Sequence, residues 1–165
     1  MCKMVYLASD TEFPLIPVES VDLDSDEILV FDSELDMVTS IYIEELPESE
    51  QAVRKHLIKP FVYKAYTYQG CGCRFGFYFE DEMSDVAKEL QIICQKCTEL
   101  LFQYLQENVG TGEVLEIYCC WAGAEYLDRN TDLDRVIELS SLELEGNFEF
   151  QERQLTRIFS LPIMD

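Results

Sequence analysis

The sequence lacks the features that would assign it to a membrane or secreted class. No run of apolar residues approaches the roughly 18 that a membrane-spanning helix needs. Residues 1–10 contain only a short apolar stretch that ends in Asp10, unlike a secretory signal. A Gly/Ser-rich linker and an internal repeat are also absent. We therefore expect a single cytoplasmic domain that spans residues 1–165.

Positive charge is scarce. The 165 residues include 12 Lys and Arg, one His and 33 Asp and Glu, which gives a net charge of −21. A field of that sign repels nucleic-acid backbones and anionic membranes, so we expect neither as a partner. Hydrophobic residues make up 48% of the chain, which is typical of a folded domain.

The acids are concentrated near the N-terminus. Residues 4–53 contain fourteen acids and no Lys or Arg. This concentration exceeds what solubility requires, and it destabilises the fold by self-repulsion. We therefore expect an exposed acidic surface that docks a basic protein, as an immunity or adaptor protein would. The residues expected to form this surface are Asp22, Asp24, Asp26, Glu27, Asp32, Glu34 and Asp36.

The next zone, residues 54–79, combines five cations with many aromatic residues and contains no acid. Such a mixture can stack on bases or hold an anionic ligand. In a two-layer domain, however, half of the rings must face the core. We therefore favour core packing, with the cations complementing acids elsewhere in the fold.

Hydrophobic periodicity predicts one long helix among several strands. The helix is expected from about Ser84 to Asn108, with Leu90, Ile93, Cys97, Leu101 and Tyr104 buried on one face. A short helix is expected at 51–58. Strands are expected at 3–8, 27–31, 37–45, 61–68, 74–79, 113–121, 136–143 and 148–158. This pattern predicts an α+β fold, a single domain with an antiparallel-rich sheet and one long helix packed on a face.

Two of the seven cysteines lie in the run Gly70-Cys71-Gly72-Cys73. An odd number of cysteines in a reducing compartment favours free thiols or metal ligands over a disulfide framework. The run can hold a soft metal such as Zn²⁺, with Cys2 as the third ligand and the sulfurs within about 4 Å of one another. A redox-active disulfide stays open as an alternative, and so does a purely structural turn, which the absence of a second well-spaced cysteine pair favours.

The other cysteines favour a structural role. Cys94 and Cys97 lie in the apolar stripe of the predicted helix, where a thiol behaves as a small hydrophobic group. Cys119 and Cys120 are expected to point to opposite faces of a strand. His56 follows two cations and is expected to face solvent, so a Cys–His nucleophile is unsupported. The sequence therefore favours a non-enzymatic protein.

Several segments resemble an uncharacterised family of bacterial hypothetical proteins. They are Met1-Cys2 followed by Tyr6-Leu7-Ala8-Ser9-Asp10, the stretch Pro14-Leu15-Ile16-Pro17, the run Val53-Arg54-Lys55 and the run Gly70-Cys71-Gly72-Cys73. The similarity extends to Trp121-Ala122-Gly123 and departs at Arg74, where we expect a small residue. The resemblance implies a bacterial single-domain protein, and it implies no activity, cofactor or catalytic residue.

Overall fold

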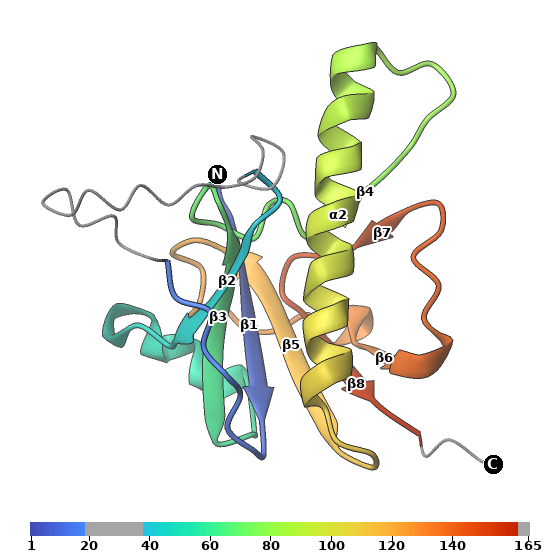
Figure 1. Cartoon of the computed structure of the whole chain (residues 1–165). Coiled ribbons are helices and arrows are strands. Elements are labelled where there is room, and N and C mark those ends of the chain that lie inside the picture. The colour runs from blue at the N-terminus through green and yellow to red at the C-terminus, as the bar shows by residue number, and fades with distance from the viewer. Residues whose placement is uncertain (19–37, 162–165) are drawn as a thin grey trace, which may run out of the picture.

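Strand β1 (Lys3–Ser9) lies inside a six-stranded sheet because its side chains are apolar on both faces. The other strands are β2 (Ile41–Glu45), β3 (Phe61–Thr67), β4 (Gly76–Phe77), β5 (Val114–Trp121), β6 (Arg135–Glu138), β7 (Phe148–Glu149) and β8 (Gln154–Phe159). In the computed structural model, which describes residues 1–18 and 38–161, the strand order is β2-β3-β1-β5-β8-β6 (Figure 1). Neighbouring strands are antiparallel except β6 and β8, which are parallel. Strands β4 and β7 form a separate two-stranded ribbon.

The sheet is covered on both faces. The long helix α2 (Asp85–Asn108) packs on one face, where Val5 and Leu7 join its core, while Tyr6 of the same strand faces the other side. That second face is covered by the 3-10 helix η1 (Glu48–His56). Shorter 3-10 helices are η2 (Thr131–Leu133) and η3 (Leu139–Ser141). The alternation of side chains along β1 therefore divides the core into two clusters.

The start of helix α2 is set by a side-chain cap. The hydroxyl of Ser84 accepts a hydrogen bond from the backbone N–H of Ala87 at 3.2 Å, and Asp85 places negative charge at the positive helix end. The helix ends at Asn108, just before Gly110. These limits agree with the predicted helix.

Burial along α2 differs from the prediction in its first turns. Cys97, Leu101 and Tyr104 are buried as expected, but Leu90 is 46% exposed and Ile93 is only partly buried. The N-terminal half of α2 extends past the sheet, beside the β4–β7 ribbon (Figure 1). The prediction for Leu90 was wrong because that part of α2 extends past the six-stranded sheet.

The α+β fold with an antiparallel-rich sheet is confirmed, although several predicted strands are shorter than expected. The strand expected at 74–79 is reduced to β4, and the one at 136–143 ends where η3 begins. The segment 148–158 is divided into β7 and β8 by a turn at Arg153, whose φ is +59°. The strand expected at 27–31 lies outside the described residues. Among the helices that the structure describes, none is long and apolar enough to cross a membrane.

The two leucines of α2 provide a matched test of this packing. Leu101→Ala should lower the free energy of unfolding by about 2–5 kcal/mol, because Leu101 is completely buried. Leu90→Ala should lower it by less than about 0.5 kcal/mol, since surface substitutions have small effects. Urea unfolding of both variants measures the difference. Equal costs would contradict the described position of the helix.

Candidate metal site of three cysteines

The turn that follows β3 brings two cysteines back toward β1. The N–H of Gly70 donates to the carbonyl of Thr67 at 2.7 Å, and the N–H of Thr67 donates to the carbonyl of Cys71 at 2.9 Å. Gly70 has a φ of +78°, a left-handed conformation that glycine adopts without strain. These bonds fold the chain into a tight turn directly after the strand.

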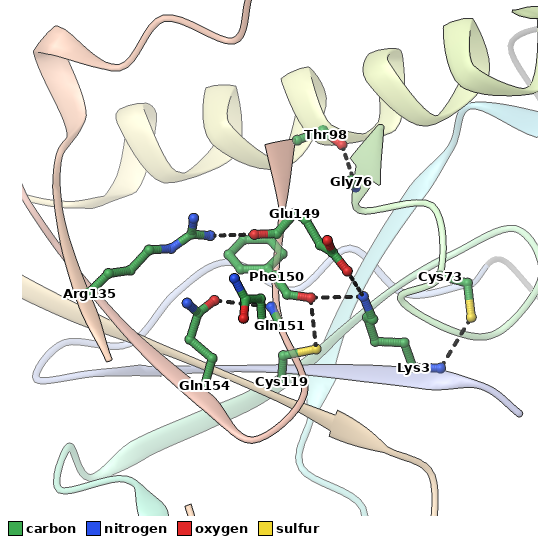
Figure 2. A network of polar contacts seen from close by, with 10 residues as sticks. All are labelled: Lys3, Cys73, Gly76, Thr98, Cys119, Arg135, Glu149, Phe150, Gln151 and Gln154. Carbon is green, nitrogen blue, oxygen red and sulfur yellow. Dashed lines mark hydrogen bonds and ion pairs between the residues drawn. The ribbon is translucent and has the colours of Figure 1, made fainter. Parts of the chain in front are cut away.

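The turn is hydrogen-bonded to the main chain of Lys3. The carbonyl of Lys3 accepts from the N–H of Gly72 at 2.8 Å, and the N–H of Lys3 donates to Sγ of Cys73 at 3.1 Å (Figure 2). A Cβ on Gly72 would lie 2.6 Å from Cγ2 of Val5. Only glycine therefore allows the turn to approach β1 this closely.

Cys2, Cys71 and Cys73 form the thiol cluster. Cys2 precedes β1 and is held by the hydrogen bond from the N–H of Ala122 to its carbonyl, at 2.8 Å. The three sulfur atoms lie within 4.8 Å of one another, and this is the one such group of ligating side chains among the described residues. Thiolates around a tetrahedral Zn²⁺ are separated by about 3.8 Å, given Zn–S bonds of about 2.3 Å. The cluster can hold a metal ion after an inward shift of about an ångström.

The cluster is open on one side. Cys2 and Cys73 are exposed, whereas Cys71 is only 4% exposed. Burial raises the pKa of Cys71 to about 12, and the hydrogen bond to Cys73 contributes to the rise. The Cys71 thiol keeps its proton at neutral pH, so a metal ion must displace that proton to bind.

The remaining four cysteines are buried, as the sequence predicted for Cys94 and Cys97. Cys94 and Cys97 lie on the inner face of α2, and Cys119 and Cys120 belong to the cores on opposite faces of the sheet. Burial raises the pKa of Cys97 to about 11 and that of Cys119 to about 12. Such thiols are unreactive.

The prediction that His56 faces solvent was wrong. His56 is 7% exposed, and its ring stacks on Tyr118 with 4.3 Å between centroids. Burial lowers its pKa. On the same face of the sheet, the hydroxyl of Tyr6 lies 2.8 Å from a carboxylate oxygen of Glu50 and 3.0 Å from one of Glu125. Because these contacts are all long-range in sequence, periodicity alone does not reveal this polar network.

The cationic zone is partly neutralised within the fold, as predicted. Lys64 pairs with Glu50 at 2.7 Å, and Lys55 pairs with Asp128 at 3.3 Å. Arg74 is an exception, because no carboxylate of the described residues lies within ion-pair distance of it. The seven acids predicted to dock a basic protein, Asp22 to Asp36, lie outside the described residues.

Comparison of the chain with family models, curated proteins and solved structures gives no match. The resemblance to a bacterial family therefore stays a prediction, and the function must be argued from the site itself.

Gly72→Ala tests the close approach of the turn to β1. The added methyl group overlaps Val5, so the substitution should destabilise the protein by about 1–3 kcal/mol, as overpacking of a core does. In a Val5→Ala background the cost of Gly72→Ala should fall, because Cγ2 of Val5 is gone. A double-mutant cycle measured by urea unfolding gives the coupling. The same cost in both backgrounds would contradict the contact.

Proposed function

We propose that this protein binds a soft metal ion such as Zn²⁺ through the thiolates of Cys2, Cys71 and Cys73. The observation that carries the proposal is the convergence of the three sulfur atoms within 4.8 Å. Thiolates are the ligands that Zn²⁺ and other soft ions prefer. The N–H of Lys3 supports this role, because its hydrogen bond to Sγ of Cys73 at 3.1 Å holds that sulfur beside the start of β1.

Three protein ligands are typical of zinc sites that keep an open coordination position. Structural zinc sites usually have four protein ligands, whereas sites that exchange or activate a molecule have three. The exposure of Cys2 and Cys73 gives external molecules access to the ion. We therefore propose an accessible site at which the ion, or its fourth ligand, exchanges.

The turn has backbone hydrogen bonds that do not involve the three sulfur atoms. Its backbone is already held by hydrogen bonds to Thr67 and Lys3, and the N–H of Phe75 donates to the carbonyl of Gly72 at 3.0 Å. Small zinc domains that lack such support unfold when the metal is removed. The site proposed here adds stability by linkage alone. We propose that the protein acts in a reducing compartment such as the cytoplasm, because free thiols persist there.

The full chain, purified under reducing conditions and exposed to Zn²⁺, should retain one ion per chain by elemental analysis. Cys73→Ser should weaken binding by more than about 100-fold, since even outer-shell partners of a metal contribute 10–100-fold. Cys120→Ala is the matched control, because Cys120 is buried in the core on the η1 face and should not affect binding.

Two results would refute the metal proposal. One is a Cys73→Ser variant that retains zinc as well as the native protein does. The other is a reduced native protein that binds no stoichiometric metal while its thiols form a disulfide under mild oxidation, detected as the loss of two hydrogens. That second result would favour the redox alternative.

Removal of zinc by a chelator should leave the secondary structure unchanged in circular dichroism and lower only the melting temperature. The reason is that ligand binding stabilises the native state without creating it. Loss of the α2 signal on chelation would show that the metal has a structural role instead.

Docking of a basic protein to the seven acids from Asp22 to Asp36 remains a second hypothesis, supported by the net charge of −21.

Association with such a partner should weaken steeply as salt is raised, because exposed charges are screened beyond about 10 Å at 0.1 M. The variant Asp22→Lys, Asp24→Lys, Asp26→Lys, Glu27→Lys should lose this association. Its control reverses the exposed acids Glu80, Asp81, Glu82 and Glu89. Equal binding by both variants at all salt concentrations would refute the hypothesis.

A further inference from the structure

A pocket lies between the N-terminal half of α2 and the β4–β7 ribbon, next to the thiol cluster. Its volume is about 610 Å³, within the range of about 300–1,000 Å³ that small-molecule sites occupy. Leu90 of α2 lines one side, and Phe148 of β7 lines another. Cys73 lines the pocket too, so the pocket and the thiol cluster share a residue.

The charge of the pocket is opposite to that of the chain. Three cations line it, Lys3, Arg74 and Arg135, and Glu149 is its one acidic lining residue. Glu149 lies 3.5 Å from the Lys3 ammonium, and its side chain is 69% exposed. Two positive charges thus remain without a matching carboxylate in the pocket, in a protein with a net charge of −21.

Arg74 has an unused donor at this site. Its Nη1 donates to the carbonyl of Val38 at 2.8 Å, but its buried Nε has no hydrogen-bond partner. A buried donor without a partner is unfavourable, and more so when it belongs to a charged group. An anion in the pocket offers Arg74 the charge partner that the described residues do not provide.

Arg135 is held by neutral groups. Its guanidinium donates to the carbonyl of Glu149 at 2.8 Å (Figure 2). It also lies 4.9 Å from the ring centre of Phe148. Its Nε donates to the hydroxyl of Thr156 at 3.2 Å. Lys3 is also held by a neutral group, since its ammonium donates to the carbonyl of Phe150 at 2.8 Å, in addition to its contact with the Glu149 carboxylate. These bonds fix the position of both cations, and those of Arg135 leave its charge without a paired carboxylate among the described residues.

The rest of the lining suits an apolar body. Four aromatic residues line the pocket, Phe75, Phe77, Tyr78 and Phe148. The amide oxygen of Gln91 is already occupied within the fold, because it accepts a hydrogen bond from the N–H of Tyr78 at 2.9 Å. The pocket therefore combines a cationic part with aromatic walls, as a site for an amphipathic anion does.

We propose that this pocket binds a small organic dianion with an aromatic or other apolar body, whose acid group faces Lys3, Arg74 and Arg135. Phosphate monoesters and dicarboxylates share this chemistry, and guanidinium groups bind both in a planar, two-pronged geometry. The proposal does not depend on the metal, because the cations and aromatic rings are present without it.

The test uses the full chain in reducing, chelator-containing buffer, because phosphate and carboxylate probes also bind Zn²⁺. Titration calorimetry should detect saturable binding of phenyl phosphate or phthalate, and the tighter probe identifies the acid class. Inorganic phosphate, which lacks the apolar body, should bind at least about 10-fold more weakly. Benzyl alcohol, which lacks the charge, should not bind measurably. If neither aromatic dianion saturates the protein by about 10 mM, the proposal is wrong.

Arg74→Gln should weaken binding of the better probe by about 10-fold or more, because it removes a charge-assisted donor. Lys88→Gln is the matched control, since it removes the same charge from an exposed position of α2 outside the pocket. If Arg74→Gln fails to fold, Arg74→Lys keeps the charge, removes the two-pronged geometry and should still weaken binding. Equal weakening by the Lys88 and Arg74 variants would show non-specific attraction and overturn the proposal.

Discussion

The main chain of Lys3 is the constraint on which the candidate site depends. The pairing of β1 with β3 begins at Val5, so one edge of β1 lacks a partner strand at the residues before Val5. The turn after β3 completes this edge, through the N–H of Gly72 and the sulfur of Cys73. Unpaired strand edges are unfavourable, and satisfying this one places Cys73 beside the start of β1. The thiol cluster is thus a consequence of sheet completion as well as of cysteine content.

The convergence of the three thiols could be anticipated from sequence because its causes are local. Cys2 directly precedes an apolar strand, and glycines on both sides of Cys71 indicate a turn that can approach another backbone closely. The exposure of Leu90 could not be anticipated in this way. Periodicity identifies the apolar face of a helix but not the point at which the sheet beneath it ends.

Contacts between distant segments explain the other differences. His56 follows two cations and has the local pattern of a solvent-facing residue, but η1 folds over the sheet and stacks its ring on Tyr118. Arg135 reaches the pocket because β6 pairs in parallel with β8, the exception in an otherwise antiparallel sheet. Hydrophobic patterns predict strands, whereas strand order depends on the packing of the whole domain.

Lys3 also connects the thiol cluster with the basic pocket. Its main chain binds Gly72 and Cys73, while its side chain reaches into the pocket and binds the carbonyl of Phe150. Both proposed sites therefore contact the same residue, and thermodynamic linkage makes any effect of one ligand on the affinity of the other reciprocal. A buried cation without a paired carboxylate is unfavourable, and among the described residues Arg74 and Arg135 have none, whereas Lys3 contacts Glu149. The proposal of an anion site rests on the placement of these three cations around a single pocket, next to the thiol cluster.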